Sequence, residues 1–167
     1  MENSTKVSLF KEVMGNYPTG VTVVTTVDEH RIPLGLTVNS FASVSIDPLL
    51  VLWSIDKRVS SYKSFIKTDK FAVHVLSGDQ SEICNLFASK GTDRFENCEW
   101  NLSEYNLPII SGASGVLQCK TIKTIEAGDH TILIGEVVDI QNENKEPLLY
   151  HKRNVGKIPE EFYNNGR

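Results

Sequence analysis

The sequence lacks the segments that mark secretion or insertion into a membrane. Its longest apolar run covers residues 49–53, far short of the roughly 20 residues that a membrane-spanning helix needs. The first six residues, Met-Glu-Asn-Ser-Thr-Lys, contain neither the basic segment nor the apolar stretch of a signal peptide. We therefore expect a cytoplasmic protein that does not bind membranes.

Cysteine is also scarce. The three cysteines, Cys84, Cys98 and Cys119, are an odd number at wide spacings. They form no Cys-x-x-Cys pair, and no histidine pair accompanies them as a zinc site requires. We expect three reduced thiols, at least two of them filling the core, which fits a reducing compartment.

An excess of basic charge and the common catalytic motifs are missing as well. Lys and Arg number 17 against 21 Asp and Glu, a net charge of -4, which argues against nucleic acid as a partner but leaves room for a local phosphate site.

The sequence contains no Gly-x-Gly-x-x-Gly, no phosphate loop, no Gly-x-Ser-x-Gly and no His-Glu-x-x-His. We therefore do not expect a Rossmann dinucleotide site, a P-loop nucleotidase, a serine hydrolase or a zinc protease.

The 167 residues, 40% hydrophobic and 23% charged, fit one globular domain without internal repeats. Periodicity and turn residues predict helices at 6–14, 59–67 and 80–88 and an irregular segment at 89–112. Strands are expected at 20–27, 34–39, 42–46, 49–55, 71–76, 115–126, 130–141 and 147–151. Many strands and few short helices, without βαβ alternation, predict a mostly β protein built as an antiparallel barrel.

Polar residues interrupt an otherwise apolar strand at residues 35–45. Thr37, Asn39, Ser43 and Ser45 supply hydroxyls and an amide, and such groups must find hydrogen-bonding partners if they are buried. A ligand with several donors and acceptors along one edge would satisfy them. The alternative is that they decorate the solvated face of an antiparallel sheet.

A second stretch, residues 57–63, follows a predicted strand and opens a predicted helix. Ser60 and Ser61 lie there with Lys57, Arg58 and Lys63. Hydroxyls and backbone N–H groups at a helix start, with basic side chains nearby, predict a phosphate site. The alternative is an ordinary N-cap serine beside solvated cations.

A histidine, His130, begins a predicted strand directly after the turn at 126–129. Its imidazole could reach the end of the barrel and contact a ligand there, or it could cap the turn and serve stability alone. The other three histidines, His30, His74 and His151, have no such context and are expected at the surface or in packing.

Taken in order, these stretches resemble the flavin reductase-like, FMN-binding split-barrel family, whose members supply reduced flavin to two-component monooxygenases. Each motif is weak alone, and their collinear order from about residue 8 to about residue 158 carries the resemblance. The matching residues are 17–26, 35–45, 47–48, 71–77, 94–95, 108, 128–130 and 135–137. The first two read Tyr-Pro-Thr-Gly-Val-Thr-Val-Val-Thr-Thr and Gly-Leu-Thr-Val-Asn-Ser-Phe-Ala-Ser-Val-Ser.

The resemblance implies a six-stranded split barrel that forms a homodimer with the flavin near the subunit interface. Residues matching the part of the family that lines the flavin ring and ribityl chain are Thr37, Val38, Asn39 and Ser40. Ser43 and Ser45 match the family's Ser-x-Ser segment and are expected to belong to the flavin site as well. Residues matching the family's phosphate segment are Arg58, Ser60 and Ser61. Phe95 matches an aromatic close to the flavin or nicotinamide, and His130 matches a histidine near the nicotinamide. Trp53 stands where many relatives carry a smaller residue, and it is expected to narrow or reshape the pocket.

These matches predict an NAD(P)H:flavin oxidoreductase that reduces FMN, or FAD, and hands it to a monooxygenase. The flavin itself would carry out the redox chemistry, which explains why the sequence shows no catalytic triad. Two alternatives remain: a protein with tightly bound FMN that passes electrons to another acceptor, and a flavin-binding module without turnover. The sequence does not decide between FMN and FAD, or between NADH and NADPH.

Overall fold

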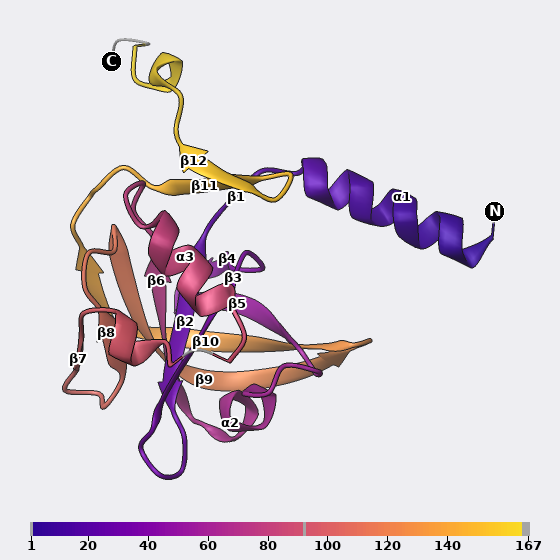
Figure 1. Ribbon diagram of the computed structural model, residues 1–167. Helices are drawn as coiled ribbons and strands as arrows, with labels where there is room; N and C mark the ends of the chain where they lie inside the picture. Colours follow the sequence, from indigo (N-terminus) through magenta and orange to yellow (C-terminus); the bar gives the residue numbers. More distant parts are fainter. Residues whose placement is uncertain (1, 92, 165–167) are drawn as a thin grey trace.

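The computed structural model describes residues 2–91 and 93–164, which form a β-rich body with a few short helices (Figure 1). The helices are α1 (Asn3–Asn16), α2 (Tyr62–Lys67) and α3 (Ser81–Ala88), with two 3₁₀ turns, η1 (Phe95–Asn97) and η2 (Glu160–Phe162). The first six strands are β1 (Thr19–Gly20), β2 (Thr22–Val27), β3 (Pro33–Val38), β4 (Ala42–Ile46), β5 (Leu49–Asp56) and β6 (Lys70–Val75). The other six are β7 (Trp100–Leu102), β8 (Pro108–Ile110), β9 (Gly115–Ala127), β10 (His130–Asn142), β11 (Leu148–His151) and β12 (Asn154–Lys157).

Seven of the strands form one antiparallel sheet in the order β3-β2-β6-β9-β10-β5-β4. The hairpin of β9 and β10 lies at its centre, and β3 and β4 are its edges. Within residues 2–91 and 93–164 no ladder joins β3 to β4, so the sheet is not closed by backbone pairing. The fold is therefore mostly β with few helices, as expected, while a closed barrel is not observed.

The main core lies on one face of this sheet. Strand β5 alternates as a half-buried strand should, with Val51, Trp53 and Ile55 pointing inward. Trp53 makes edge-to-face contacts with Phe65 of α2, at 5.1 Å between ring centroids, and with Phe71 of β6, at 5.9 Å. These aromatic contacts fix α2 against the end of the sheet that carries the start of β10.

A second core lies under α3, which covers β2 and β3 (Figure 1). Cys84 and Phe87 are the buried residues of this helix. Phe87 makes an edge-to-face contact with Phe95, and Phe95 makes another with Trp100, with 5.2 Å between the ring centroids in both pairs. The aromatic chain ties α3 to the 89–112 segment, which therefore has a fixed place against the sheet.

The N-terminal helix is longer than predicted and stands away from the body (Figure 1). Every residue of α1 is exposed except Gly15, which is half-buried. Its apolar side chains include Phe10, 66% exposed, and Val13, 68% exposed. None of the helices formed by the described residues is long and apolar enough to cross a membrane.

Two segments differ from the sequence-based expectation. The stretch 89–112 is not irregular throughout, because β7 and β8 pair within it as a short antiparallel hairpin. The polar C-terminal part contains β12, which pairs with β11 in a small sheet with β1. β7, β8 and β12 have only three or four residues each, too few to show a clear period of two. The three cysteines are free thiols, with Cys84 and Cys119 buried and Cys98 half-buried.

Candidate functional site

A cleft of about 750 Å³ opens beside β3, within the range of small-molecule sites. Three segments far apart in sequence form its walls: β3, the turn after β5, and the end of α3 with the loop that follows. The lining residues are Leu36, Thr37, Asp56, Arg58, Val59, Ser60, Phe87, Ala88, Lys90, Gly91 and Arg94. Three of the residues predicted from sequence, Thr37, Arg58 and Ser60, therefore meet in one cleft.

Close approach of α3 shapes the β3 wall. Gly35 faces the ring of Phe87, and a Cβ at Gly35 would come within 2.7 Å of Phe87 Cε1 and 2.8 Å of Cδ1. Thr37 donates its hydroxyl to the carbonyl of Cys84 on α3, at 2.7 Å. These contacts hold the helix against the strand, so that Phe87 and Ala88 form a fixed wall of the cleft.

The predicted phosphate residues lie in the turn before α2 rather than in its first helical turn. The helix begins at Tyr62, and Ser61 is its N-cap residue but makes no side-chain cap bond. Ser60 is exposed and lines the cleft, whereas Ser61 is half-buried and does not appear among the lining residues described. The structure thus separates two serines that look equivalent in the sequence.

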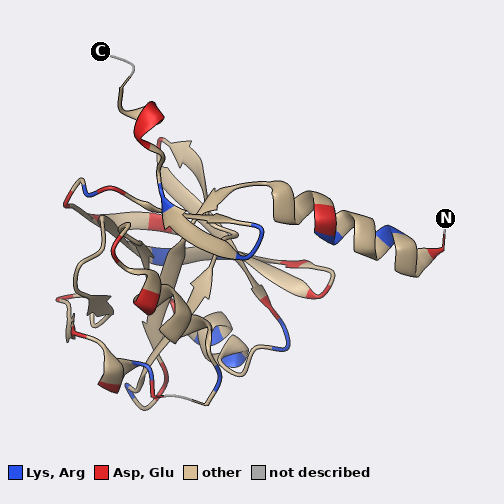
Figure 2. Cartoon of the chain, turned by 45° about the horizontal axis from the view of Figure 1, so that its top comes forward, with Lys and Arg blue, Asp and Glu red and all other residues tan. Residues whose placement is uncertain are grey.

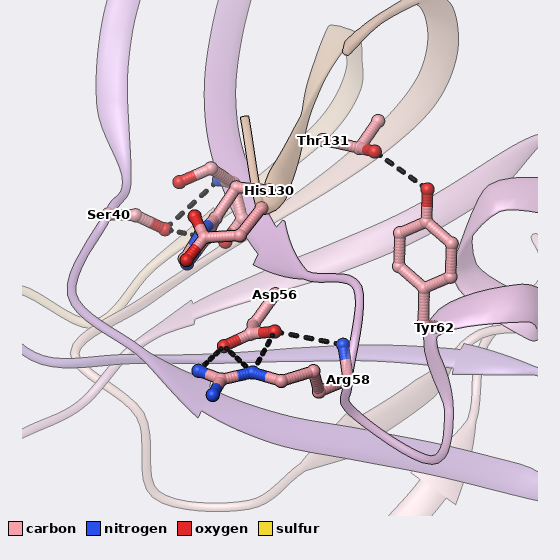
Figure 3. Close-up of polar contacts among 8 residues, drawn as sticks. Ser40, Asp56, Arg58, Tyr62, His130 and Thr131 are labelled. Carbon is pink, nitrogen blue, oxygen red and sulfur yellow. Dashed lines mark hydrogen bonds and ion pairs between the residues drawn. The ribbon is translucent and has the colours of Figure 1, made fainter. Parts of the chain in front are cut away.

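Arg58 is paired with Asp56 at the mouth of the cleft (Figure 3). The Asp56 carboxylate accepts bonds from the Arg58 backbone N–H at 2.8 Å and from its Nη2 at 2.7 Å, with Nε at 3.1 and 3.2 Å from the two oxygens. The hydrogen bonds from Arg58 hold the pKa of Asp56 well below its usual range. Asp56 is therefore ionised at neutral pH, and it occupies the guanidinium that the sequence assigns to a phosphate.

Arg94 and Lys90 add cationic groups that sequence reasoning did not assign to the site. The Arg94 guanidinium donates to the carbonyls of Gly35 and Ser89, the latter at 2.6 Å. Partial burial lowers the pKa of Arg94, but an arginine stays protonated in proteins. Figure 2 shows acidic and basic residues interspersed along the chain, so the cationic lining is a local feature.

His130 lies close to the Asp56 end of the cleft without lining it. Its backbone pairs with that of Asp56 across β10 and β5. The imidazole Nδ1 is 2.7 Å from the Asp129 carboxylate, and the side chain is 41% exposed. This bond to His130 lowers the pKa of Asp129. A neutral His130 with its proton on Nδ1 keeps Nε2 available to accept a bond from a ligand.

The remaining predicted residues are placed around the cleft rather than on its described walls. Val38 and Asn39 line a smaller hollow of about 270 Å³, which shares Thr37 and Ala88 with the cleft. The Ser40 hydroxyl donates to the carbonyl of Ser54 and accepts its N–H, both at 3.0 Å, and so ties the end of β3 to β5 (Figure 3). Ser43 and Ser45 lie on the edge strand β4.

Two aromatic residues lie behind the cleft. Phe95 is 8% exposed and packs under Phe87, so it supports the wall from one layer below. Trp53 is fully buried in the main core among Phe65 and Phe71. Trp53 is therefore part of the core packing and is not among the described lining residues, contrary to the expectation that it narrows or reshapes the pocket.

The arrangement suits a ligand that carries a flat ring system and a phosphate. Apolar groups of Leu36, Val59 and Phe87 offer surface for a ring, while Arg58, Lys90 and Arg94 offer charge for a phosphate. Ser60 adds a hydroxyl at the same mouth. The donor set is thus compatible with a flavin nucleotide.

Comparison with known proteins gives the family. The flavin reductase like domain matches residues 14–159. The chain is 41% identical over 152 residues to the reductase component of the flavin-dependent trigonelline monooxygenase of Acinetobacter baylyi, covering 91% of this chain and 49% of that protein. It is 39% identical over 149 residues to the FMN reductase (NADH) SmoA of Agrobacterium fabrum, covering 89% of this chain and 84% of that protein. The chain thus spans about half the length of the first relative and most of the second.

A solved structure agrees in both fold and sequence. The NADH:FAD oxidoreductase SgcE6 of Streptomyces globisporus, in complex with NAD and FAD fragments, superimposes with a TM-score of 0.87 at 35% identity. The match covers 95% of this chain and 96% of that one.

Proposed function

The chain belongs to the flavin reductase like domain family, and from this premise we propose that it is an NAD(P)H:flavin oxidoreductase. It transfers a hydride from the nicotinamide to FMN or FAD and passes the reduced flavin to a flavin-dependent monooxygenase. The observation that carries the proposal is the cleft beside β3, where an apolar wall and a cationic mouth meet. The relatives named as reductases for FMN and FAD support both flavins and NADH as the donor.

The flavin, when bound, supplies the hydride chemistry, so the chain needs only to bind the flavin and the nicotinamide, to orient them and to shield them from solvent. Ser60, Arg58, Lys90 and Arg94 hold the phosphate by hydrogen bonds and charge at the cleft mouth. Thr37, Val38 and Asn39 at the end of β3 present backbone and side-chain polar groups to the edge of the ring system. Hydroxyls and N–H groups of this kind stabilise negative charge that develops on a ring during reduction.

His130 serves the nicotinamide in this proposal, because it stands beside the Asp56 end of the cleft and not on its wall. Asp129 fixes the ring through Nδ1. Nε2 is then directed to a polar group of the nucleotide, such as the carboxamide or the pyrophosphate. Ser40, Ser43, Ser45, Ser61 and Phe95 would act by shaping the surroundings of the flavin.

We propose a homodimer in solution, with α1 as part of its interface. The helix buries nothing in its own chain, and six apolar side chains lie along it and its end: Val7, Leu9, Phe10, Val13, Met14 and Tyr17. An isolated helix of this length is marginal in water. A second copy would cover these side chains, and it would provide the stabilisation that the helix lacks within one chain.

We further propose that the seven-stranded sheet forms the family's split barrel, with the two Ser40–Ser54 bonds tying the end of the edge strand β3 to β5, the neighbour of the other edge strand. The reaction would take place in the cytoplasm, where reduced nicotinamide nucleotides are available and the free thiols of the three cysteines stay reduced.

Anaerobic mixing of NADH with excess FMN and a catalytic amount of the protein tests the proposed function. We expect many FMN molecules to be bleached for each protein chain. Bleaching of at most one flavin per chain would instead support the electron-transfer alternative with tightly bound FMN. No bleaching, with flavin binding intact, would support a binding module and contradict the proposal.

A further inference from the structure

A carboxylate stands inside the cationic mouth of the cleft. Asp56 is the acidic group among the described lining residues, whereas Arg58, Lys90 and Arg94 are basic. The Asp56 side chain is 23% exposed and that of Arg58 is 82% exposed. The Asp56 carboxylate is therefore less exposed than the guanidinium it binds, and both side chains line the cleft.

The Asp56 carboxylate and a ligand phosphate would compete for the same donors. Arg58 already directs Nη2 and Nε to Asp56, with a shortest distance of 2.7 Å. A phosphate ester carries close to two negative charges at neutral pH, so it must share this guanidinium and approach a like charge. Both effects weaken binding of a phosphorylated ligand and leave an unphosphorylated one nearly unaffected.

The negative charge of Asp56 is not needed for the local turn. The turn requires an acceptor for the Arg58 backbone N–H, which Oδ1 provides at 2.8 Å. An asparagine side-chain oxygen makes the same bond in such turns. Compared with an amide, the carboxylate therefore adds negative charge at the cleft mouth and a second oxygen, Oδ2, that accepts bonds from the Arg58 guanidinium.

We propose that Asp56 sets the affinity of the cleft for the flavin phosphate, as a counter-ion that keeps binding weak enough for the flavin to leave after reduction. The inference rests on the proposed function, because it assumes that the cleft holds a flavin nucleotide. The charge of Asp56 would explain why a flavin bound beside three basic residues dissociates as a substrate does, instead of remaining bound as a permanent cofactor.

The test compares dissociation constants of FMN and riboflavin, measured by fluorescence quenching, for the wild type and Asp56→Asn. We expect FMN to bind about tenfold more tightly to the variant at low salt, and riboflavin to change by less than about twofold. The gain should shrink in high salt, since the mouth is open to solvent. Glu126→Gln is the matched control, because it removes a carboxylate from the neighbouring Lys57 ion pair, 3.6 Å long, away from the cleft lining.

Three results would overturn the inference: unchanged FMN affinity in Asp56→Asn, equal tightening for FMN and riboflavin, or the same gain in Glu126→Gln. Asp56→Ser is a second neutral variant that also keeps an acceptor for the turn, and it replaces Asp56→Asn if that protein does not fold. A wild type that binds neither flavin would contradict the proposed function itself, and is thus distinguishable from a failure of the role of Asp56.

Discussion

At the scale of single residues, the structure separates side chains that the sequence presents as equals. Ser60 and Ser61 are neighbours in sequence, yet only Ser60 is among the described residues of the cleft lining. Arg94 was part of a recognisable motif, but its place in the cleft depends on the carbonyls of Gly35 and Ser89, which lie on different segments. Such contacts are set by tertiary packing, and a one-dimensional pattern does not contain them.

Gly35 is required by the packing of α3 on β3. In Gly35→Ala the new Cβ would meet the Phe87 ring at 2.7 Å, so the ring or the helix must shift. We expect a loss of about 1–3 kcal/mol in unfolding free energy and weaker flavin binding, because Phe87 lines the cleft. Urea unfolding and flavin titration measure the two effects. Gly156→Ala, with open space around its Cβ, is the control, and an equal loss there would contradict this explanation.

His130 should act on the nicotinamide and not on the flavin. His130→Ala should reduce kcat/KM for the pyridine nucleotide by roughly five- to a hundredfold, since one hydrogen bond and some positioning are lost. FMN affinity and melting temperature should remain nearly unchanged. Steady-state kinetics with His30→Ala as the control, a histidine 75% exposed to solvent, measures this. A lower melting temperature with unchanged kinetics would assign His130 to stability alone.

His74 is a buried side chain that links two backbone segments and makes the stability of the fold depend on pH. Its Nδ1 donates to the carbonyl of Val23 and its Nε2 accepts the N–H of Ile110, both at 3.0 Å. Burial lowers the pKa of His74 from 6.5 to about 4. Below pH 6.5 His74 therefore takes up a proton in the unfolded chain but stays neutral in the folded chain. The contribution of His74 to the free energy of unfolding is fully present above pH 6.5 and decreases as the pH falls toward 4.

The loss attributable to His74 is on the order of 3 kcal/mol over that interval. His74→Asn keeps a donor for Val23 but does not titrate, so we expect lower stability at neutral pH and a flatter decline between pH 6.5 and 4. Urea unfolding at a series of pH values measures the difference between the two proteins. Parallel curves would show that His74 is not the group responsible.

At the scale of elements, strong periodicity predicted the long strands well, whereas the shortest strands were missed. The long strands β9 and β10 and the β-branched strand β2 were confirmed within a few residues. β7, β8 and β12 were missed because three or four residues carry no clear period. The periodicity at residues 6–14 predicted a helix that α1 extends at both ends, but periodicity alone could not show that its apolar side chains are exposed in its own chain.

The exposed stripe of α1 should be the part of the chain on which dimer formation depends. Phe10→Glu places a charge on a side chain that is now 66% exposed within one chain, and it should shift the protein from dimer to monomer at micromolar concentration. Glu12→Gln is the control, because it lies about 200° further around the helix. Sedimentation velocity measures the mass. A dimer that persists in Phe10→Glu, or a fully active wild-type monomer, would contradict the role of α1.

At the scale of the whole molecule, the cleft exists only because three distant segments converge. In the sequence, β3 and the turn at 56–60 each had a structural explanation beside the functional one, and the loop after α3 was expected only as part of an irregular segment. Their meeting around Thr37, Arg58 and Ser60 follows from the sheet order and from the packing of α3 through Phe87. The resemblance to a family indicated this convergence, whereas composition and periodicity could not have placed the segments together.

The most direct test of the account is steady-state oxidation of NADH with FMN or riboflavin as acceptor, by the wild type, Ser60→Ala and Ser61→Ala. The account predicts flavin-dependent turnover, and a loss of several-fold to about a hundredfold in kcat/KM for FMN in Ser60→Ala, because a hydrogen bond to a charged group is worth about 1.5–3 kcal/mol. Riboflavin should be affected far less, and Ser61→Ala should resemble the wild type. No flavin-dependent turnover in the wild type, or equal losses for FMN and riboflavin in Ser60→Ala, would contradict it.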